Sequence, residues 1–313
     1  MNEPRSHERT KSGTPGVFVF SCFRGLLFVL FVSGAAYAQP GFPTAIPQTK
    51  FNSGQDVVPY FEGWIRNKDG SFDMVFGYFN RNWQEELAIA PGMSNSVTIP
   101  GSKDVDHGQP TYFLPRRQGW AYRVTVPSNF GKQDRGAGAP GGSEVTWTIV
   151  ANGKKEVGYG TLDPVAEITE RIIQTRGGLN PGEDDPNRPP VVAVAPVASA
   201  VVATPVKLTA TVTDDGLPKP RDPVKRTTDI ASTANATRQA NSNAAPRARG
   251  LTVSWMQLRG PAKVTFEKAS GVAVVDGKAT ATATFAAPGT YVLRASANDG
   301  ALTTKSDVTI TVR

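Results

Sequence analysis

Short stretches in which polar and apolar residues alternate recur along this sequence, separated by glycine, proline, asparagine and serine. In one of them Phe72, Met74, Phe76 and Tyr78 occupy every second position, which is the period of a β-strand with one buried face. Short strands with turn residues between them are typical of sandwiches and barrels. The 31 glycines and 25 prolines among 313 residues agree with such a turn-rich chain. The sequence therefore predicts an all-β protein.

The first two strands are expected to form a hairpin. Tyr60–Arg66 precedes the alternating stretch, and Asn67-Lys68-Asp69-Gly70 lies between them. The Asp-Gly pair tolerates the positive φ angles that a tight turn requires. Further strands are expected over Glu86–Ala90, Ser96–Ile99, Ala121–Val126, Glu144–Val150 and Lys155–Tyr159.

Residues 1–38 have the three parts of a secretory signal peptide. Basic residues precede the short apolar run Leu26–Val32, and small residues follow it up to Ala36-Tyr37-Ala38. The run is too short to span a bilayer, so we expect cleavage after Ala38 and no transmembrane span in the mature chain. The protein would then be periplasmic, extracellular or bound to the cell surface. A lipoprotein anchor at Cys22 is the alternative, but the apolar run follows this cysteine instead of preceding it.

Removal of the signal peptide would leave no cysteine and one histidine, His107. A disulfide framework, a cysteine-based zinc site and a multi-histidine metal centre are therefore excluded for the mature chain. Its stability must therefore come from hydrophobic cores. A bound ion could stabilise the fold further, and it is the one additional contribution that we consider.

Two β-rich regions follow a proline-rich lead at 39–50. Strand patterns occupy residues 51–162, which resemble no family we identify, and residues 191–313. Between them, residues 163–190 begin with a helical pattern and continue as an acidic, proline-rich linker. The sequence thus predicts two β-sandwich-type domains joined by a short helix and a proline-rich linker.

The helical pattern consists of Val165, Ile168, Ile172 and Ile173, which would fall on one face of a helix. Asp163-Pro164 can cap and open such a helix, and Gly177-Gly178 would end it. We therefore expect one amphipathic helix between the two regions.

In the second region, residues 217–250 interrupt the strand patterns. This segment lacks aromatic residues and is rich in alanine, asparagine, threonine and arginine. It offers too little apolar surface to offset the entropy of ordering it, so we expect a mobile basic loop. About seven strands, a number typical of a β-sandwich, are expected over Val191–Ala195, Val206–Thr213, Leu251–Leu258, Lys263–Glu267, Ala279–Ala286, Thr290–Ala297 and Thr304–Val312.

Five features spread over residues 187–313 occur together: Asn187-Arg188-Pro189-Pro190-Val191, Asp214-Asp215-Gly216, Trp255, Pro288-Gly289-Thr290-Tyr291 and Asn298-Asp299-Gly300. As a set they resemble the PKD-like (polycystic-kidney-disease-type) immunoglobulin-like sandwich. Trp255 would then fill the space between two sheets, and Tyr291 would form a tyrosine corner. The resemblance implies a non-catalytic extracellular module that serves in adhesion or as a spacer. The inserted loop at 217–250 departs from the compact pattern of the family.

One end of such a sandwich would gather acidic and amide side chains. Calcium prefers six to eight oxygen ligands, so these residues predict a Ca²⁺ site, the one cofactor we consider. The alternative is that they only form tight turns. The candidate ligands are Asp184, Asp185, Asn187, Asp214, Asp215, Asn298 and Asp299.

The basic loop offers a second candidate site, for an anionic partner such as a cell-envelope polysaccharide. It lacks the aromatic residues on which bases stack, so nucleic acid is not expected. The alternative is a solvated loop without a partner. Its cations are Lys219, Arg221, Lys225, Arg226, Arg238, Arg247 and Arg249.

In the first region Trp83, Tyr112 and Trp120 are candidates for an aromatic platform that stacks on sugars. Trp83 has polar neighbours and is the best candidate for exposure, whereas a domain without disulfides needs most of its aromatic residues in the core.

Asp104, Asp106 and His107, followed by Arg116 and Arg117, are a candidate for hydrolysis. No Gly-x-Ser-x-Gly or His-Glu-x-x-His motif accompanies them, and a turn with a surface histidine is the alternative. The sequence therefore predicts an exported, non-enzymatic binding or structural protein that meets a cell-envelope protein or polysaccharide. A carbohydrate-binding accessory protein and a hydrolase with a site near His107 are the alternatives.

Overall fold

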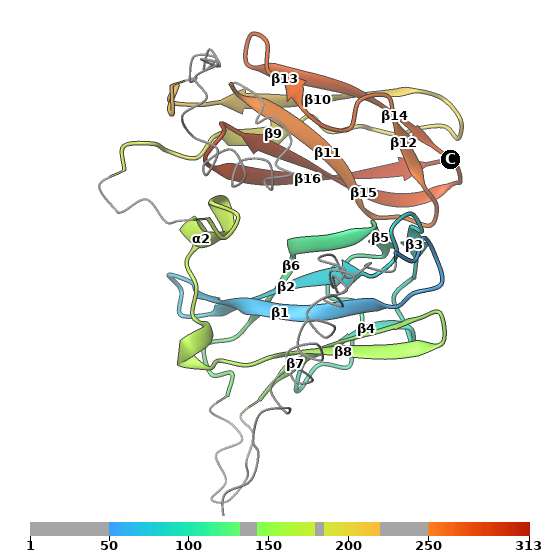
Figure 1. Cartoon of the computed structure of the whole chain (residues 1–313), viewed down its shortest axis with the longest axis vertical. Helices are drawn as coiled ribbons and strands as arrows, with labels where there is room; N and C mark the ends of the chain where they lie inside the picture. Colours follow the sequence, from blue (N-terminus) through green and yellow to red (C-terminus); the bar gives the residue numbers. More distant parts are fainter. Residues whose placement is uncertain (1–49, 132–142, 179–184, 220–249) are drawn as a thin grey trace, which may run out of the picture. The chain divides into compact units, whose positions relative to one another are not determined.

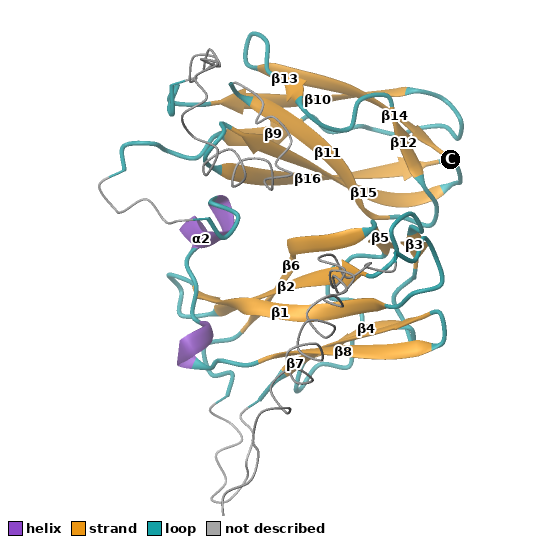
Figure 2. Ribbon diagram, viewed as in Figure 1, coloured by secondary structure: helices purple, strands orange, loops and turns teal. Residues whose placement is uncertain are grey.

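The structure is a computed structural model that describes residues 50–131, 143–178, 185–219 and 250–313 (Figure 1). Strands dominate these residues (Figure 2), which confirms the all-β prediction. The predicted signal peptide lies outside the described residues. Lys50–Arg313 forms one compact unit, and the domain boundaries expected from the sequence stay a prediction.

The first sandwich has two three-stranded antiparallel sheets and a two-stranded ribbon. One sheet has the order β1-β2-β6, with strands Val57–Arg66, Phe72–Asn80 and Arg116–Val126. The other has the order β4-β7-β8, with strands Asn95–Thr98, Val145–Ala151 and Lys154–Gly160. The ribbon pairs β3 (Leu87–Ala88) with β5 (Tyr112–Phe113).

The predicted hairpin joins β1 to β2. Asn67 accepts a backbone hydrogen bond from Gly70, whose φ of 86° suits a glycine, and the register of the two strands begins at Arg66↔Phe72. The alternating side chains of β2 and β7 then meet in an aromatic core. The Trp147 ring packs edge-on against Phe76 at 6.1 Å between centroids, and Tyr122 lies 5.7 Å away.

The segment between the two sandwiches differs from the single amphipathic helix predicted. It contains a 3₁₀ turn, η1 (Pro164–Ala166), capped by Asp163, and a short helix, α2 (Glu170–Gln174). Between them the backbone is extended, because the amide of Ile168 donates to the carbonyl of Trp64 in β1. The predicted apolar face is consequently divided: Ile173 is buried, whereas Val165 is 93% exposed. Gly177, with φ of 71°, follows the helix as expected.

The second sandwich has two four-stranded sheets. Their orders are β12-β14-β10-β9 and β13-β11-β15-β16. All seven predicted strands are present, and the two-residue strand β13 is additional. The strands are β9 (Val191–Val194), β10 (Val206–Thr213), β11 (Thr252–Arg259), β12 (Val264–Phe266), β13 (Val272–Ala273), β14 (Lys278–Phe285), β15 (Gly289–Asn298) and β16 (Thr303–Val312).

Two aromatic residues of this sandwich lie where the sequence predicts. Trp255 is buried in the hydrophobic cluster that lies between the sheets. Tyr291, near the start of β15, donates its hydroxyl to the carbonyl of Ala287 at 2.8 Å, which is a tyrosine corner. The strand order and this corner define an immunoglobulin-like sandwich.

Candidate functional site

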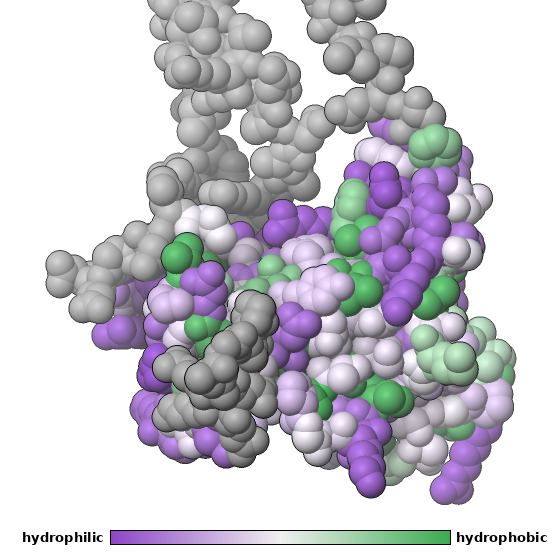
Figure 3. Space-filling model, turned by 90° about the horizontal axis from the view of Figure 1, so that it is seen from below, coloured by the Kyte–Doolittle hydropathy of each residue, from purple (hydrophilic) through white to green (hydrophobic). Residues whose placement is uncertain are grey.

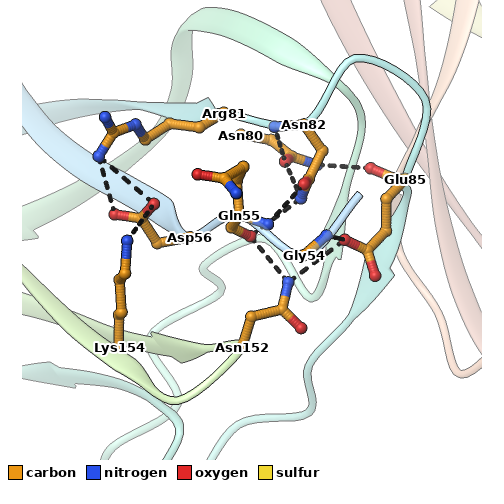
Figure 4. A network of polar contacts seen from close by, with 9 residues as sticks. All are labelled: Gly54, Gln55, Asp56, Asn80, Arg81, Asn82, Glu85, Asn152 and Lys154. Atoms are coloured by element: carbon orange, nitrogen blue, oxygen red, sulfur yellow. Dashed lines mark hydrogen bonds and ion pairs between the residues drawn. The ribbon is translucent and has the colours of Figure 1, made fainter. Parts of the chain in front are cut away.

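A network of polar side chains holds the beginning of the described chain against the first sandwich (Figure 4). Asn82 is fully buried; its side chain accepts from the amide of Gln55 at 2.7 Å and donates to the carbonyl of Gln55 at 2.9 Å. Asn152, in the β7–β8 turn, donates to the same carbonyl and to Glu85. Three segments far apart in sequence are thereby joined at one corner.

Asp56 is the charged centre of this network. Its carboxylate lies 3.3 Å from Arg81 and 3.7 Å from Lys154 (Figure 4). Burial opposes its ionisation, but hydrogen bonds from the backbone and from Glu156, together with the two cations, hold the pKa of Asp56 below its ordinary value. The carboxylate is therefore ionised, and Arg81 and Lys154 compensate its negative charge.

Trp83 lies on the loop that this network fixes. The backbone amide of Trp83 donates to the carbonyl of Phe51 at 2.9 Å, and the Trp83 side chain remains 39% exposed. Lys50 and Arg116 lie over its indole ring. The exposure predicted for Trp83 is thus present, and two cations accompany it that the sequence did not point to.

The other two candidate platform residues have different surroundings. Tyr112 is buried in β5, and its hydroxyl donates to Glu86. Trp120 is half-buried in β6, where its ring packs against Gly177. The structure therefore does not bring Trp83, Tyr112 and Trp120 together on one surface.

A bulge in β6 forms the centre of the contact between the sandwiches. The β2–β6 register passes from Phe76↔Tyr122 to Tyr78↔Gln118, so extra residues of β6 bulge out, and Trp120 has a positive φ of 46°. Its amide donates to the carboxylate of Glu62 beneath the bulge. The carbonyls of the bulge are thereby left for partners in the second sandwich.

Two cations of the second sandwich bind these carbonyls. Lys305 Nζ donates to the carbonyl of Trp120 at 2.7 Å, and the Arg294 guanidinium donates to that of Ala121 at 2.6 Å. Arg294 is oriented by paired hydrogen bonds to Asp307, the residue opposite it on β16. We call these contacts, with Glu62, the bulge joint.

A second group of contacts between the sandwiches lies at and after the C-terminal end of β11, around Arg259. Arg259 and Asp106 form an ion pair at 2.6 Å, and Lys263 lies 2.9 Å from Glu86. Thr111 donates its amide to the carbonyl of Leu258 and accepts a hydrogen bond from Gly260. The two sandwiches therefore contact each other through two separated groups of residues.

The bulge joint contains two ionisable groups in an unusual environment. Burial and the charge of Arg294 lower the pKa of Lys305 to about 8, with Glu62 opposing the change. Burial raises the pKa of Glu62, although the Trp120 amide, Arg117 and Lys305 favour its ionised form. We therefore expect the stability of the bulge joint to depend on pH.

The predicted acidic end is partly assembled. Burial raises the pKa of Asp214, and the negative charge of the nearby Asp299 raises it further. Asp215 accepts from the amide of Arg188, which brings Asn187 to the same end. Asp184 lies outside the described residues.

Most of these side chains make turn contacts. Asp185 pairs with Arg171 at 2.7 Å, and Asn298 donates to the carbonyl of Leu302. Two buried oxygen atoms, Asn187 Oδ1 and Asp299 Oδ2, have no hydrogen-bond partner. In the part of the chain that the structure describes, no three histidine, cysteine, aspartate or glutamate residues form a group suited to a metal.

His107 does not meet the groups that hydrolysis would use. Its Nε2 lies 2.9 Å from the carbonyl of Asp104, and its amide donates to Gln109. Asp106 is engaged by Arg259. This arrangement agrees with the alternative interpretation, a turn that carries a surface histidine.

Of the cations of the basic loop, only Lys219 belongs to the described residues, and it is exposed. The remaining candidates, Arg221, Lys225, Arg226, Arg238, Arg247 and Arg249, lie outside them.

Across the described ranges, no helix has the length and hydrophobicity to cross a membrane. On the face drawn in Figure 3, hydrophobic and hydrophilic residues are interspersed.

No family model and no curated protein matches this sequence. Solved structures give weak overlaps. The D00-D0 domain of intimin is 14% identical over 82% of this chain and 100% of its own, with a TM-score of 0.26. A chimeric titin Z1Z2-Z1Z2 tandem is 10% identical over 82% and 99%, with a TM-score of 0.22. The S-layer protein rSbsC(31-844) is 11% identical over 82% and 35%, with a TM-score of 0.23. Overlaps this weak carry no inference about function.

Proposed function

We propose that this chain is an exported structural or adhesion protein in which a PKD-like sandwich is held at a fixed orientation to a second β-sandwich. The bulge joint is the observation that carries the proposal. Neighbouring domains move relative to each other unless their interface prevents it. Here two cations of one sandwich bind successive carbonyls of the other, and further ion pairs restrain the same contact at a distance. A fixed orientation is what a spacer requires.

The proposal is tested by the distance between the sandwiches. Spin labels on Tyr159→Cys and Val275→Cys, both exposed, would report it by pulsed electron resonance in the exported chain. We expect one narrow distance distribution, and a broad one after Arg294→Ala and Lys305→Ala are added. A broad distribution without these substitutions would contradict the spacer role.

Export is tested separately in cells. An epitope-tagged chain should appear in the periplasmic or surface fraction, and cells lacking the protein should attach less to surfaces. Retention of the tagged chain in the cytosol would refute this part of the proposal.

We further propose that the acidic end binds calcium. The two unpartnered buried oxygen atoms of Asn187 and Asp299 support it, because such atoms cost free energy unless a partner meets them. In Asp299→Asn, the Oδ1 atom can still accept from the amides of Ala301 and Leu302 while the charge is lost. We expect millimolar Ca²⁺ to raise the melting temperature of the wild type and not of this variant. Equal responses, or none, would reject the site.

A further inference from the structure

Two cations and two aromatic residues meet at the corner that the polar network fixes. Lys50 Nζ lies 4.5 Å and the Arg116 guanidinium carbon 4.2 Å from the centroid of the Trp83 ring. The neighbouring Phe51 is 51% exposed. We call Lys50, Phe51, Trp83 and Arg116 the Trp83 patch.

Within the described ranges, which contain both residues, neither Lys50 nor Arg116 forms an ion pair. Two acids of the polar network are engaged elsewhere: Asp56 binds Arg81 and Lys154, and Glu85 accepts from Gly54 and Asn152 (Figure 4). Two cations beside an exposed indole are thus available to an external anion.

The backbone is strained where the patch places its guanidinium. Arg116 has a φ of 67°, a left-handed conformation that is strained for a residue with a Cβ atom. At this angle the guanidinium lies 4.7 Å from the Phe79 centroid as well as over Trp83, and donates one hydrogen bond to the carbonyl of Arg81. The strain therefore accompanies a cation fixed at the surface.

The Trp83 patch is also rigidly supported. The amides of Trp83 and Gln84 donate to the carbonyls of Phe51 and Asn52, and the fully buried Asn82 fixes the loop from beneath. A surface whose side chains are held before binding loses less entropy when a partner arrives. Such support is expected of a recognition surface and is not needed by an ordinary solvated loop.

We propose that the Trp83 patch binds an acidic polysaccharide, whose carboxylates pair with Lys50 and Arg116 while a sugar ring lies along the exposed part of Trp83 and Phe51. This names the partner of the adhesion module and so rests on the proposed function. The net charge of the full sequence is +7, and about +5 would remain after removal of residues 1–38, which favours an anionic partner. Recruitment to a lipid surface typically uses about four to eight clustered cations, more than the patch provides.

The test measures retention of the exported chain in gels containing polygalacturonate, a carboxylate polymer, or dextran, a neutral one. We expect retention by polygalacturonate alone, weakening as salt rises. The pair Lys50→Gln and Arg116→Gln should weaken it at least about tenfold, since removing each charge-assisted contact costs on the order of 1 kcal/mol. Lys207→Gln, an exposed lysine of the second sandwich, is the matched control and should bind as the wild type does.

Arg116→Gly separates binding from folding. Glycine adopts the positive φ without strain, so the melting temperature should change little while retention falls. Retention that is equal in wild type and the double variant, or absent in the wild type, would overturn the proposal. So would stronger patch-dependent binding to phosphatidylglycerol vesicles than to polygalacturonate. Any of these results would refute the polysaccharide partner. If the distance distribution is narrow and the chain is exported, the proposed spacer role would remain.

Discussion

Lys305 gives the most direct test of the bulge joint, because its charge changes within an accessible pH range. Burial and Arg294 lower its pKa to about 8 in the folded chain, whereas the ordinary value is 10.5. Between these values the unfolded chain holds a proton that the folded chain has released. The free energy of unfolding therefore rises with pH across this window. At 1.36 kcal/mol per pH unit, the rise due to this residue is about 3 kcal/mol.

The assay is urea unfolding of the wild type and of Lys305→Met at intervals from pH 7 to 10.5. Methionine keeps much of the apolar stem and carries no charge. Loss of the hydrogen bond to Trp120 lowers the stability of the variant by about 1 kcal/mol at every pH, which does not affect the slope. Relative to the variant, the wild type should therefore gain about 3 kcal/mol of stability between pH 8 and 10.5.

Other titrating groups cancel in this comparison because both chains contain them. Lys207→Met, which removes an exposed lysine, should run parallel to the wild type. If Lys305→Met also runs parallel, Lys305 titrates normally, and its half-buried position against the carbonyl of Trp120 would be refuted.

Three further substitutions test the fold. Asn82→Ala should lower the free energy of unfolding by about 2–4 kcal/mol in urea titrations, because it removes the acceptor of the Gln55 amide and one of the two donors to the Gln55 carbonyl; an effect below 1 kcal/mol would contradict the network. Tyr291→Phe should cost about 1–2 kcal/mol by the same measurement through loss of the tyrosine corner, and an unchanged stability would show that the corner is not formed. Gly260→Ala should lower the melting temperature more than Gly271→Ala. Both glycines have positive φ, but only at Gly260 would the new methyl clash with a ring, that of Tyr291; equal effects would contradict this packing.

The strands could be predicted from the sequence because their signal is local. In β7 the side chains of Val145, Trp147 and Ile149 are buried at every second position, and this period is visible without knowledge of any partner strand. The single helix was predicted wrongly for the complementary reason. Ile168 fits the helical period, yet its amide pairs with Trp64 more than a hundred residues earlier, and no local pattern reports such a contact.

The same distinction applies to the candidate sites. Polar neighbours in the sequence pointed to the exposure of Trp83, but nothing local pointed to Lys50 or Arg116, which reach its ring from other segments. Arg294 alternates with the buried residues Leu293 and Ala295, so its outward direction was predictable. The acceptors of Arg294 and Lys305, 173 and 185 positions away, were not.

The bulge in β6 has a consequence for how the chain tolerates change. The acceptors for Lys305 and Arg294 are main-chain oxygens, which every amino acid possesses. Replacing the side chains at positions 120 and 121 therefore leaves both acceptors in place, provided that the bend itself survives. Sequence change at these two positions is thus buffered, and the requirement for particular residues in the joint falls on the two cations opposite and on Glu62, which accepts from the Trp120 amide.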